Sequence, residues 1–478
     1  MKQPPMHGTA SRWRCLVVLL AVAACGGGSD APTSSTTTPP RDTVVTTPTP
    51  APSTVPNVVF ILGEAQGWTS SSVQMDPALP TSKHPLLRTP GLDRLAAEGM
   101  RYTNFYAPSP RCTPSRAAYF TGHSPAQLRI TFVKDQTDGV NPNSTLVTPI
   151  SITDLPTSIP TIGSLLRASG YATAHFGKWH VGRTDPSAYG FDESDGPTNN
   201  GGMLNVVHPN PAESYGLTSR AIDFMKRQVR ARKPFYVQLS HYAGNAVDDV
   251  LPATYAAARA QLAGAADNSV GVAATTLEMD NTIRQVQAAL DSLGITGSTY
   301  VIFTSDHGQQ GATANPPLTW GKGTVWEGGV RVPLLISGPG IPRGSSSRVQ
   351  ASGVDLVPTI LDLVGRPLSA AVRDIEGGSL KTVLTSGGTG TVVRPASEFV
   401  VHFPHYDFDP IGPASTILSG NYKLIRAYED NSLRLFDLGT DLAERNDLAR
   451  TLPAKVTELN GKLTSYLTAV GAQLPTRK

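Results

Sequence analysis

The chain has 478 residues, of which 39% are hydrophobic, and it contains 45 glycines and 40 prolines. A chain of this length and composition can bury a large core in more than one domain, which excludes a wholly disordered protein. Its formal charge of +3 arises from Lys2, Arg12 and Arg14, because the residues after Ala24 include 37 basic and 37 acidic side chains. No basic excess remains to attract nucleic acid, so nucleic acid is not expected as a partner.

The first 24 residues are typical of an export signal. A basic stretch ends at Arg14, and an apolar run of ten residues follows from Cys15 to Ala24, which is too short to span a bilayer. The sequence VAAC at Val22–Cys25 resembles the lipobox of bacterial lipoproteins, which implies a membrane anchor through a lipid on Cys25. We therefore expect residues 1–24 to be removed and the chain to be exported, as a periplasmic or cell-surface lipoprotein. An ordinary signal peptide is the alternative.

Residues 25–56 are predicted to form a tether. Between Gly26 and Pro56, 20 of 31 residues are Ser, Thr or Pro. Such a segment buries too little apolar surface to offset the entropy lost on ordering. We expect a Ser/Thr/Pro-rich linker here, extended in part by its prolines, before a folded body that starts at residue 57.

Strand and helix patterns alternate from Asn57 onward. Four short runs rich in β-branched and aromatic residues predict buried strands, at Asn57–Gly63, Tyr171–Phe176, Pro234–Ser240 and Thr299–Ser305. Helical patterns lie between them, after Pro90, before Tyr171, and along the stripe Met279, Ile283, Val286, Leu290 and Leu293. This alternation predicts an α/β domain over residues 57–387, with a large mixed, mostly parallel sheet sandwiched by helices.

Polar residues directly follow each of the four predicted strands. The four sequences are GEAQGW, GKWHVG, HYAGN and DHGQQ, in chain order. In sheets of this kind, functional sites collect at the carboxyl ends of the strands. The sequence therefore predicts one crevice lined by four loops.

The pattern changes after about Gly387. The segment from Thr416 to Leu438 alternates like antiparallel strands, with a turn at Glu429–Ser432, and an amphipathic helix is predicted over Pro453–Val470. Residues 388–478 are thus expected to form a smaller C-terminal α+β subdomain.

Cys112 is the one cysteine left once Cys15 is cleaved off and Cys25 carries lipid. Pro114 constrains the backbone near it, Ser115 is expected to cap a helix, and Arg116 lies about one turn on. A helix N-terminus and a guanidinium both favour an anionic side chain, which indicates a reactive thiol. A surface turn or a packed, inert cysteine is the alternative.

Four sequence blocks around these residues resemble those of the sulfatase family, on the alkaline phosphatase-like fold. They are CTPSR (Cys112–Arg116), which matches the CxPSR signature, GYATAHFGKWHVG (Gly170–Gly182), SDHG (Ser305–Gly308) and GKGTVWEGGVRVP (Gly321–Pro333). The blocks occur in the family's order, and the likeness extends from about Asn57 to Leu448. The chain is identified on these motifs as a member of the family.

The resemblance implies hydrolysis of a sulfate monoester of a glycan or small molecule. It implies that a formylglycine-generating enzyme converts Cys112 into Cα-formylglycine, whose hydrate is the nucleophile. Arg116 would hold this hydrate, and Lys178 and Lys322 would bind the sulfate oxygens as point charges. His180 would hydrogen-bond to the nucleophile or sulfate, and an extended backbone would direct it to the same side as Lys178.

The resemblance also implies a divalent cation, most often Ca²⁺ in this family. Asp306, His307 and position 112 match family ligands, and Glu64 stands in for the first of two aspartates that usually end the first strand. Ala65 occupies the second position and cannot bind a metal. Gln66, water or another oxygen would have to fill that place.

A second departure from the family concerns the third loop. The family usually has a histidine near Asn245, and His241 is the candidate to replace it as proton donor, with a packed histidine as the alternative. His402 and His405 are weaker candidates from the C-terminal subdomain, where packing roles are favoured.

Two other functions remain open at this point. A phosphatase or phosphonate monoesterase could use the same fold, but the reduced carboxylate set at Glu64 and Ala65 suggests one metal, which favours sulfate. A non-catalytic lipoprotein that binds sulfated glycans would explain Ala65 and Asn245, but not the intact CTPSR block.

Overall fold

The computed structural model describes residues 55–134, 144–199, 213–242, 250–310, 315–366, 368 and 374–478. The predicted leader, Cys25, most of the tether and Asn245 lie outside these residues. The described residues all belong to one compact unit, Ala51–Lys478. Across the described ranges, no helix combines the length and the hydrophobicity that a membrane span requires.

An eight-stranded mixed sheet forms the centre of this unit. In spatial order its strands are β10 (Ser345–Ser347), β2 (Gly99–Tyr102), β9 (Leu334–Ser337), β8 (Thr299–Ser305), β1 (Asn57–Gly63), β7 (Phe235–Ser240), β5 (Ala172–Gly177) and β6 (Glu193–Ser194). Neighbouring strands are parallel except where β9 pairs antiparallel with β2 and β8. The predicted mostly parallel sheet is confirmed, with β1 and β8 at the expected bounds and β5 and β7 starting one residue later.

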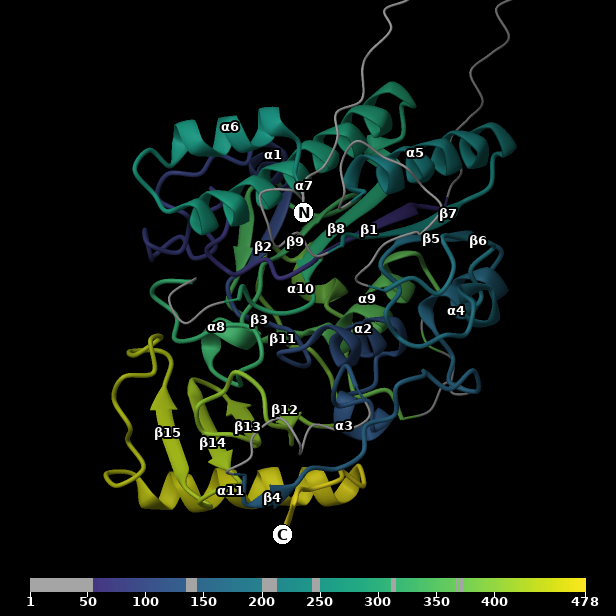
Figure 1. Cartoon of the computed structure of the whole chain (residues 1–478). Helices are drawn as coiled ribbons and strands as arrows, with labels where there is room; N and C mark the ends of the chain where they lie inside the picture. Colours follow the sequence, from purple (N-terminus) through teal and green to yellow (C-terminus); the bar gives the residue numbers. More distant parts are fainter. Residues whose placement is uncertain are drawn as a thin grey trace, which may run out of the picture. The chain divides into compact units, whose positions relative to one another are not determined.

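Helices cover both faces of this sheet (Figure 1). One layer holds α1 (Pro90–Glu98), α5 (Ser214–Ala231), α6 (Pro252–Gln261) and α7 (Asp267–Ser292), and the other holds α2 (Cys112–Thr121), α4 (Ile162–Ala168), α9 (Leu356–Leu363) and α10 (Lys381–Thr385). Strand β1 explains why two layers are needed. Its alternate residues Val58 and Phe60 pack with the second layer, and Val59 and Ile61 with the first. A strand that is apolar on both faces must be covered on both.

Shorter elements connect these layers. They are α3 (Pro125–Leu128), α8 (Glu327–Val330), the 3-10 segments η1 (Pro186–Tyr189), η3 (Thr296–Ser298) and η4 (Gly353–Asp355), and the strand pairs β3 (Phe105–Tyr106) with β11 (Ala351–Ser352) and β4 (Leu146–Val147) with β16 (Thr476–Arg477). The predicted stripe on α7 is buried from Met279 to Leu290, as expected for a core-facing helix.

A four-stranded antiparallel sheet follows near the C-terminus, with β12 (Phe399–Phe403), β13 (Ala414–Ser419), β14 (Tyr422–Ala427) and β15 (Leu433–Asp437) in chain order. Helix α11 (Pro453–Ala469) packs Leu459, Leu463 and Leu467 against one face. The other face packs on Trp326 and Val330, which belong to the GKGTVWEGGVRVP block. The second sheet therefore supports a segment of the predicted site.

The carboxyl ends of β1, β5, β7 and β8 lie at one edge of the main sheet. Gly63 is paired in register with Ser305, and Gly177 with Ser240. The residues after these strands consequently emerge side by side, so the four predicted loops share one edge of the sheet.

Candidate functional site

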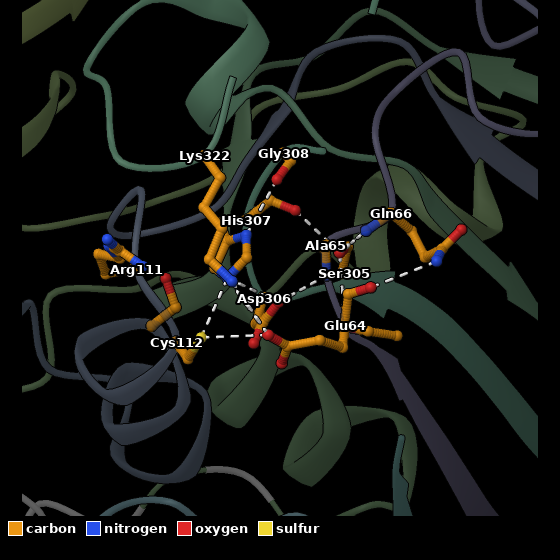
Figure 2. A network of polar contacts seen from close by, with 12 residues as sticks. Glu64, Ala65, Gln66, Arg111, Cys112, Ser305, Asp306, His307, Gly308 and Lys322 are labelled. Carbon is orange, nitrogen blue, oxygen red and sulfur yellow. Dashed lines mark hydrogen bonds and ion pairs between the residues drawn. The ribbon is translucent and has the colours of Figure 1, made fainter. Parts of the chain in front are cut away.

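Glu64, the first residue after β1, lies at the centre of the site (Figure 2). Its Oε2 accepts hydrogen bonds from Lys178 Nζ at 2.7 Å and Arg116 Nη2 at 2.9 Å. Its Oε1 lies 3.2 Å from Cys112 Sγ and 3.4 Å from Lys322 Nζ. Burial alone would raise the pKa of Glu64, but the three cations hold it well below its usual value. The carboxylate is therefore charged.

Helix α2 positions the cysteine. The helix begins at Cys112 with Arg111 as its N-cap, four residues before the start that a Ser115 cap would give. The prediction that Ser115 caps it is wrong, because the Ser115 hydroxyl bonds to the backbone of Ser109 instead. The bend that this bond closes places Cys112 in the first turn, one turn before Arg116.

Arg116 joins three of the strand-end loops and is completely buried. Besides Glu64, it donates from Nε to Asp306 Oδ2 at 3.2 Å and from Nη1 to the carbonyl of Lys178 at 2.6 Å. A guanidinium presents its donors in a rigid plane, so this residue fixes the loops after β1, β5 and β8 relative to α2.

The Cys112 thiol is buried among charged groups. Its Sγ lies 3.1 Å from His307 Nε2 and 3.2 Å from Glu64 Oε1, and the residue is 2% exposed. Burial and Glu64 raise the pKa of the thiol, but Lys178, His307 and Lys322 outweigh them and lower it well below its usual value. The environment is thus that of a reactive cysteine rather than of an exposed turn or apolar packing.

Asp306 and His307 follow β8 and face Glu64. The hydrogen bond of 2.9 Å between His307 Nδ1 and the Gly308 carbonyl places the proton on Nδ1, so Nε2 presents its lone pair toward Cys112 when the ring is neutral. Burial and the charge of Glu64 raise the pKa of Asp306 to about 7. Burial alone would lower the pKa of His307, but Asp306 raises it to about 9.

These residues form a group that can hold a metal ion. One ligand atom each from Glu64, Cys112, Asp306 and His307 lie within 4.8 Å of one another. Carboxylate and imidazole donors suit a divalent cation, and the Nδ1 bond to the Gly308 carbonyl is the kind of contact that orients a metal-bound histidine. The donor set therefore fits the divalent cation expected from the sequence.

Ala65 and Gln66 leave the place of the second aspartate without a side-chain ligand. Ala65 has φ of 52° and donates its backbone N–H to Asp306 Oδ1 at 3.1 Å. The Gln66 side chain is directed away from the cysteine (Figure 2), with Nε2 bonded to the Glu64 carbonyl and Oε1 to the Thr276 hydroxyl. Gln66 does not fill the gap.

Lys178 and His180 follow β5 after Gly177. Gly177 has φ of 94°, and a Cβ there would lie 2.0 Å from the Ser240 carbonyl oxygen, so only glycine fits. His180 has φ of 56°, so the expectation of an extended backbone is wrong. Its ring nevertheless lies near the site: burial lowers the pKa of His180 and neighbouring Cys112 partly opposes this, while its buried Nδ1 has no hydrogen-bond partner among the described residues.

Lys322 approaches from the loop between β8 and β9. Its backbone N–H donates to the Gln309 carbonyl at 2.9 Å, and its side chain is 10% exposed. Burial lowers the pKa of Lys322, but Cys112 and Glu64 raise it above its usual value. The ammonium group is consequently charged and partly open to solvent.

His241 lies beside these residues at the end of β7. Its Nε2 is 3.4 Å from the Thr282 hydroxyl, and within the described ranges its buried Nδ1 has no hydrogen-bond partner. Burial and Arg116 lower its pKa to about 4. The other two candidates serve packing, since His402 bonds to Ser415 and the Gln473 carbonyl, and His405 bonds to Thr131.

Arg111 is a neighbour of the site that the motifs did not single out. It forms a two-pronged ion pair with Asp407, which follows β12 in the second sheet. The sequence shows an arginine next to CTPSR and an acidic residue in FPHYDF, but nothing in either segment predicts that the two form an ion pair.

Comparison with known proteins agrees with this geometry. The family model described as Sulfatase matches residues 56–366. The chain belongs to the sulfatase family. This is a family of sulfuric ester hydrolases, which accounts for the four motif blocks and for the mixed sheet.

Two sulfatases illustrate the likeness. The chain is 33% identical over 372 residues to N-acetylgalactosamine-6-sulfatase of Sus scrofa, covering 70% of this chain and 66% of that protein. It is 30% identical over 412 residues to arylsulfatase A of Homo sapiens, covering 77% of this chain and 74% of that protein. The chain thus spans about two thirds to three quarters of these relatives.

Two solved structures share the fold. Ps i-CgsB in complex with k-i-k-neocarrahexaose superposes with a TM-score of 0.71 at 21% identity, covering 86% of this chain and 93% of that one. BT4656 in complex with its substrate D-glucosamine-2-N,6-O-disulfate gives 0.62 at 21% identity, covering 87% and 98%. At these identities the likeness supports the fold alone.

Proposed function

We propose that this chain hydrolyses a sulfate monoester, with residue 112 in its formylglycine form as the nucleophile. The observation that carries the proposal is the position of the Cys112 side chain among charged Lys178, Arg116 and Lys322. A hydrated aldehyde supplies a hydroxyl for attack at sulfur and a second one whose deprotonation releases the sulfate afterwards. Conversion of Cys112 would require a formylglycine-generating enzyme as a partner.

The cationic side chains have distinct tasks in this proposal. The ammonium groups of Lys178 and Lys322 bind sulfate oxygens and stabilise the charge that spreads over them during transfer. Arg116 orients residue 112 while its other donors hold the loops in place. His180, neutral because burial lowers its pKa, accepts or donates one hydrogen bond at the nucleophile.

A divalent cation, which we propose to be Ca²⁺, would be held by Glu64, Asp306, His307 and residue 112. When bound, it supplies positive charge and Lewis acidity beside the nucleophile and the sulfate. With Ala65 in place of a carboxylate, the protein contributes less negative charge to this cation than two adjacent aspartates would.

His241 is the candidate proton donor for the departing alcohol. Its pKa of about 4 makes a charged ring costly near neutral pH, which favours the packed role over the catalytic one. Replacement by asparagine separates the two roles, because loss of a proton donor slows substrates with poor leaving groups more than aryl sulfates.

We propose a sulfated carbohydrate as substrate, with an aryl sulfate as the alternative. The relative named N-acetylgalactosamine-6-sulfatase, 33% identical, supports this choice. Family membership favours sulfate over a phosphatase, a phosphonate monoesterase or a non-catalytic glycan-binding role. We also propose that the chain is exported and anchored to the membrane as a lipoprotein, through a lipid on Cys25 and a tether formed by residues 25–56.

The test begins with peptide mass spectrometry over residue 112 after co-expression with a formylglycine-generating enzyme. We expect the aldehyde in the wild type, together with faster turnover of 4-nitrophenyl sulfate than of 4-nitrophenyl phosphate. Cys112→Ala, prepared in the same way, should lack both signals. Unmodified cysteine with no turnover, or preferred phosphate turnover, would overturn the proposal.

A further inference from the structure

A group of four residues lies directly beside the nucleophile and has no task in the mechanism above. We call Arg111, Phe132, Asp407 and Phe408 the aromatic wall. Arg111 immediately precedes Cys112, and its guanidinium is paired with Asp407; their side chains are 15% and 7% exposed. The wall therefore fastens the segment after β12 to the start of α2.

The guanidinium of Arg111 also orders two aromatic rings. Its central carbon lies 4.9 Å from the ring centroid of Phe408 and 5.6 Å from that of Phe132. Cation–π contacts of this kind fix the ring relative to the charge. Phe408 is thus held in place by a group that is itself held by Asp407.

Phe408 lies on the Lys322 side of the site. A Cβ on Gly323, the residue after Lys322, would meet Phe408 Cδ2 at 2.9 Å and Asp407 Oδ2 at 2.6 Å. The charge of Arg111 also lowers the pKa of Lys322, although other groups raise it overall. The aromatic wall therefore borders the loop that carries a proposed sulfate-binding lysine.

Half of the Phe408 side chain remains in water. Phe408 is 52% exposed, whereas Cys112 is 2% exposed and Arg116 and Lys178 are completely buried. Lys322 and Arg111 keep measurable side-chain exposure, at 10% and 15%, and His180 is also partly exposed. Substrate can reach the buried residues from the side where Lys322 and Arg111 are exposed, and the exposed Phe408 contacts Arg111 and borders the Lys322 loop on that side.

We propose that Phe408 is a stacking platform for the six-membered ring that carries the sulfate ester. The exposed aromatic face would pack against the apolar face of a pyranose or an aryl ring, while Arg111 and Asp407 act as positioning residues. Because Asp407 neutralises Arg111, the wall selects for a ring rather than for a second anionic group. This inference rests on the proposed sulfate monoesterase function.

The test compares kcat/KM for N-acetylgalactosamine 6-sulfate, 4-nitrophenyl sulfate and an acyclic alkyl sulfate. In Phe408→Ala, kcat/KM for the ring-bearing substrates should fall by roughly 3–10-fold relative to the acyclic one, mainly through KM. A loss of this size is expected when one aromatic contact to a ring is removed. Phe408→Trp should retain the preference, and Asp407→Asn should weaken it. A loss on the sugar alone assigns the platform to pyranoses, and a loss on the aryl ester alone assigns it to aryl rings.

Val393→Ala is the matched control, because Val393 is an apolar side chain that is 84% exposed and is expected to leave these ratios unchanged. Equal losses on all three substrates would overturn the platform without affecting the proposed function. If the wild type hydrolyses no sulfate ester, the proposed function fails. The platform is then judged by calorimetric titration with N-acetylgalactosamine 6-sulfate, where equal or absent binding by wild type and Phe408→Ala overturns it.

Discussion

The carboxylate of Glu64 lies 2.7 Å from the ammonium of Lys178, and the two side chains are 2% and 0% exposed. This pair joins the residue after β1 to the residue after β5. Attraction between the partners offsets the cost of burying both charges, and removing one partner leaves an uncompensated buried charge. The proposed metal ligand and the proposed sulfate ligand therefore depend on each other.

Glu64→Gln is predicted to weaken divalent cation binding by at least roughly 10–100-fold. A loss of this size is typical when a residue that only orients a metal ligand is changed, and Glu64 is proposed to be a ligand itself. The amide keeps the shape of the side chain but removes its charge. Metal content after dialysis and calorimetric titration with Ca²⁺ provide the measurement. Glu458→Gln is the control, since Glu458 lies on the surface helix α11, paired with Lys455. Unchanged metal content in Glu64→Gln would remove Glu64 from the ligand set.

Ala65→Asp is predicted to strengthen Ca²⁺ binding by about tenfold, equivalent to about 1.4 kcal/mol, because added carboxylate charge raises affinity at oxygen-donor sites. Aspartate tolerates the left-handed backbone of Ala65, whose φ is 52°. Ala65→Asn has the same size and backbone tolerance without the charge, so it separates charge from shape. Equal affinities in wild type and Ala65→Asp would show that the alanine does not limit metal binding.

Lys322→Ala is predicted to lower sulfate ester turnover by roughly 10²–10³-fold, the range for losing one group that stabilises transition-state charge. Circular dichroism should be unchanged, because the side chain is partly exposed and, within the described ranges, its one bond is that of its tip to Glu64. Lys226→Ala, on the surface of α5, is the control. Wild-type rates in Lys322→Ala would exclude Lys322 from the site.

The sequence predicted the fold because local patterns carry most of the information about it. Strands β1 and β8 are continuous apolar runs closed by polar residues, and such runs are buried wherever they pack. The loop GEAQGW after the first strand and the blocks CTPSR and SDHG likewise predicted that Glu64, Cys112, Asp306 and His307 would gather. Because the carboxyl ends of neighbouring parallel strands meet at one edge of the sheet, the residues that follow these strands lie close together there.

Contacts between distant segments were beyond the same reasoning. Ser115 fits a cap locally, but its hydroxyl is taken by the Ser109 backbone in a bend that spacing does not reveal. Gln66 turns toward Thr276, which lies 210 positions away, and Arg111 pairs with Asp407 across 296 positions. Such pairings depend on the packing of whole layers.

Lys423→Met is predicted to destabilise the fold by roughly 3–5 kcal/mol, since it breaks a buried charge network. Lys423 Nζ lies 2.9 Å from Glu327 and 2.8 Å from Glu444, and all three side chains are 0% exposed. The substitution leaves two buried carboxylates with Arg331 as the remaining cation. Urea unfolding gives the measurement.

Two further variants sharpen this test. Lys455→Met removes a partly exposed lysine paired with Glu458 and should change stability by less than about 0.5 kcal/mol. Lys423→Arg keeps the charge and should fall between the wild type and Lys423→Met. Equal unfolding midpoints for Lys423→Met and Lys455→Met would show that the network adds nothing to stability.

The titration of His402 is predicted to lower the free energy of unfolding as the pH falls from about 6.5 toward 4. Burial and Arg426 lower its pKa in the folded protein to about 4, whereas an unfolded histidine titrates near 6.5. Between these values the unfolded chain binds the extra proton, so acid favours unfolding, by about 2 kcal/mol at pH 5. His402→Gln has no titrating ring, so its stability should fall by about 2 kcal/mol less than that of the wild type between pH 7 and pH 5. Urea unfolding at both pH values measures the difference. Part of it comes through His405, whose pKa is lowered by His402 as well as by burial, whereas the other buried histidines contribute equally in both proteins. Equal losses of stability in the wild type and His402→Gln would mean that His402 is protonated as readily in the folded protein as in the unfolded chain.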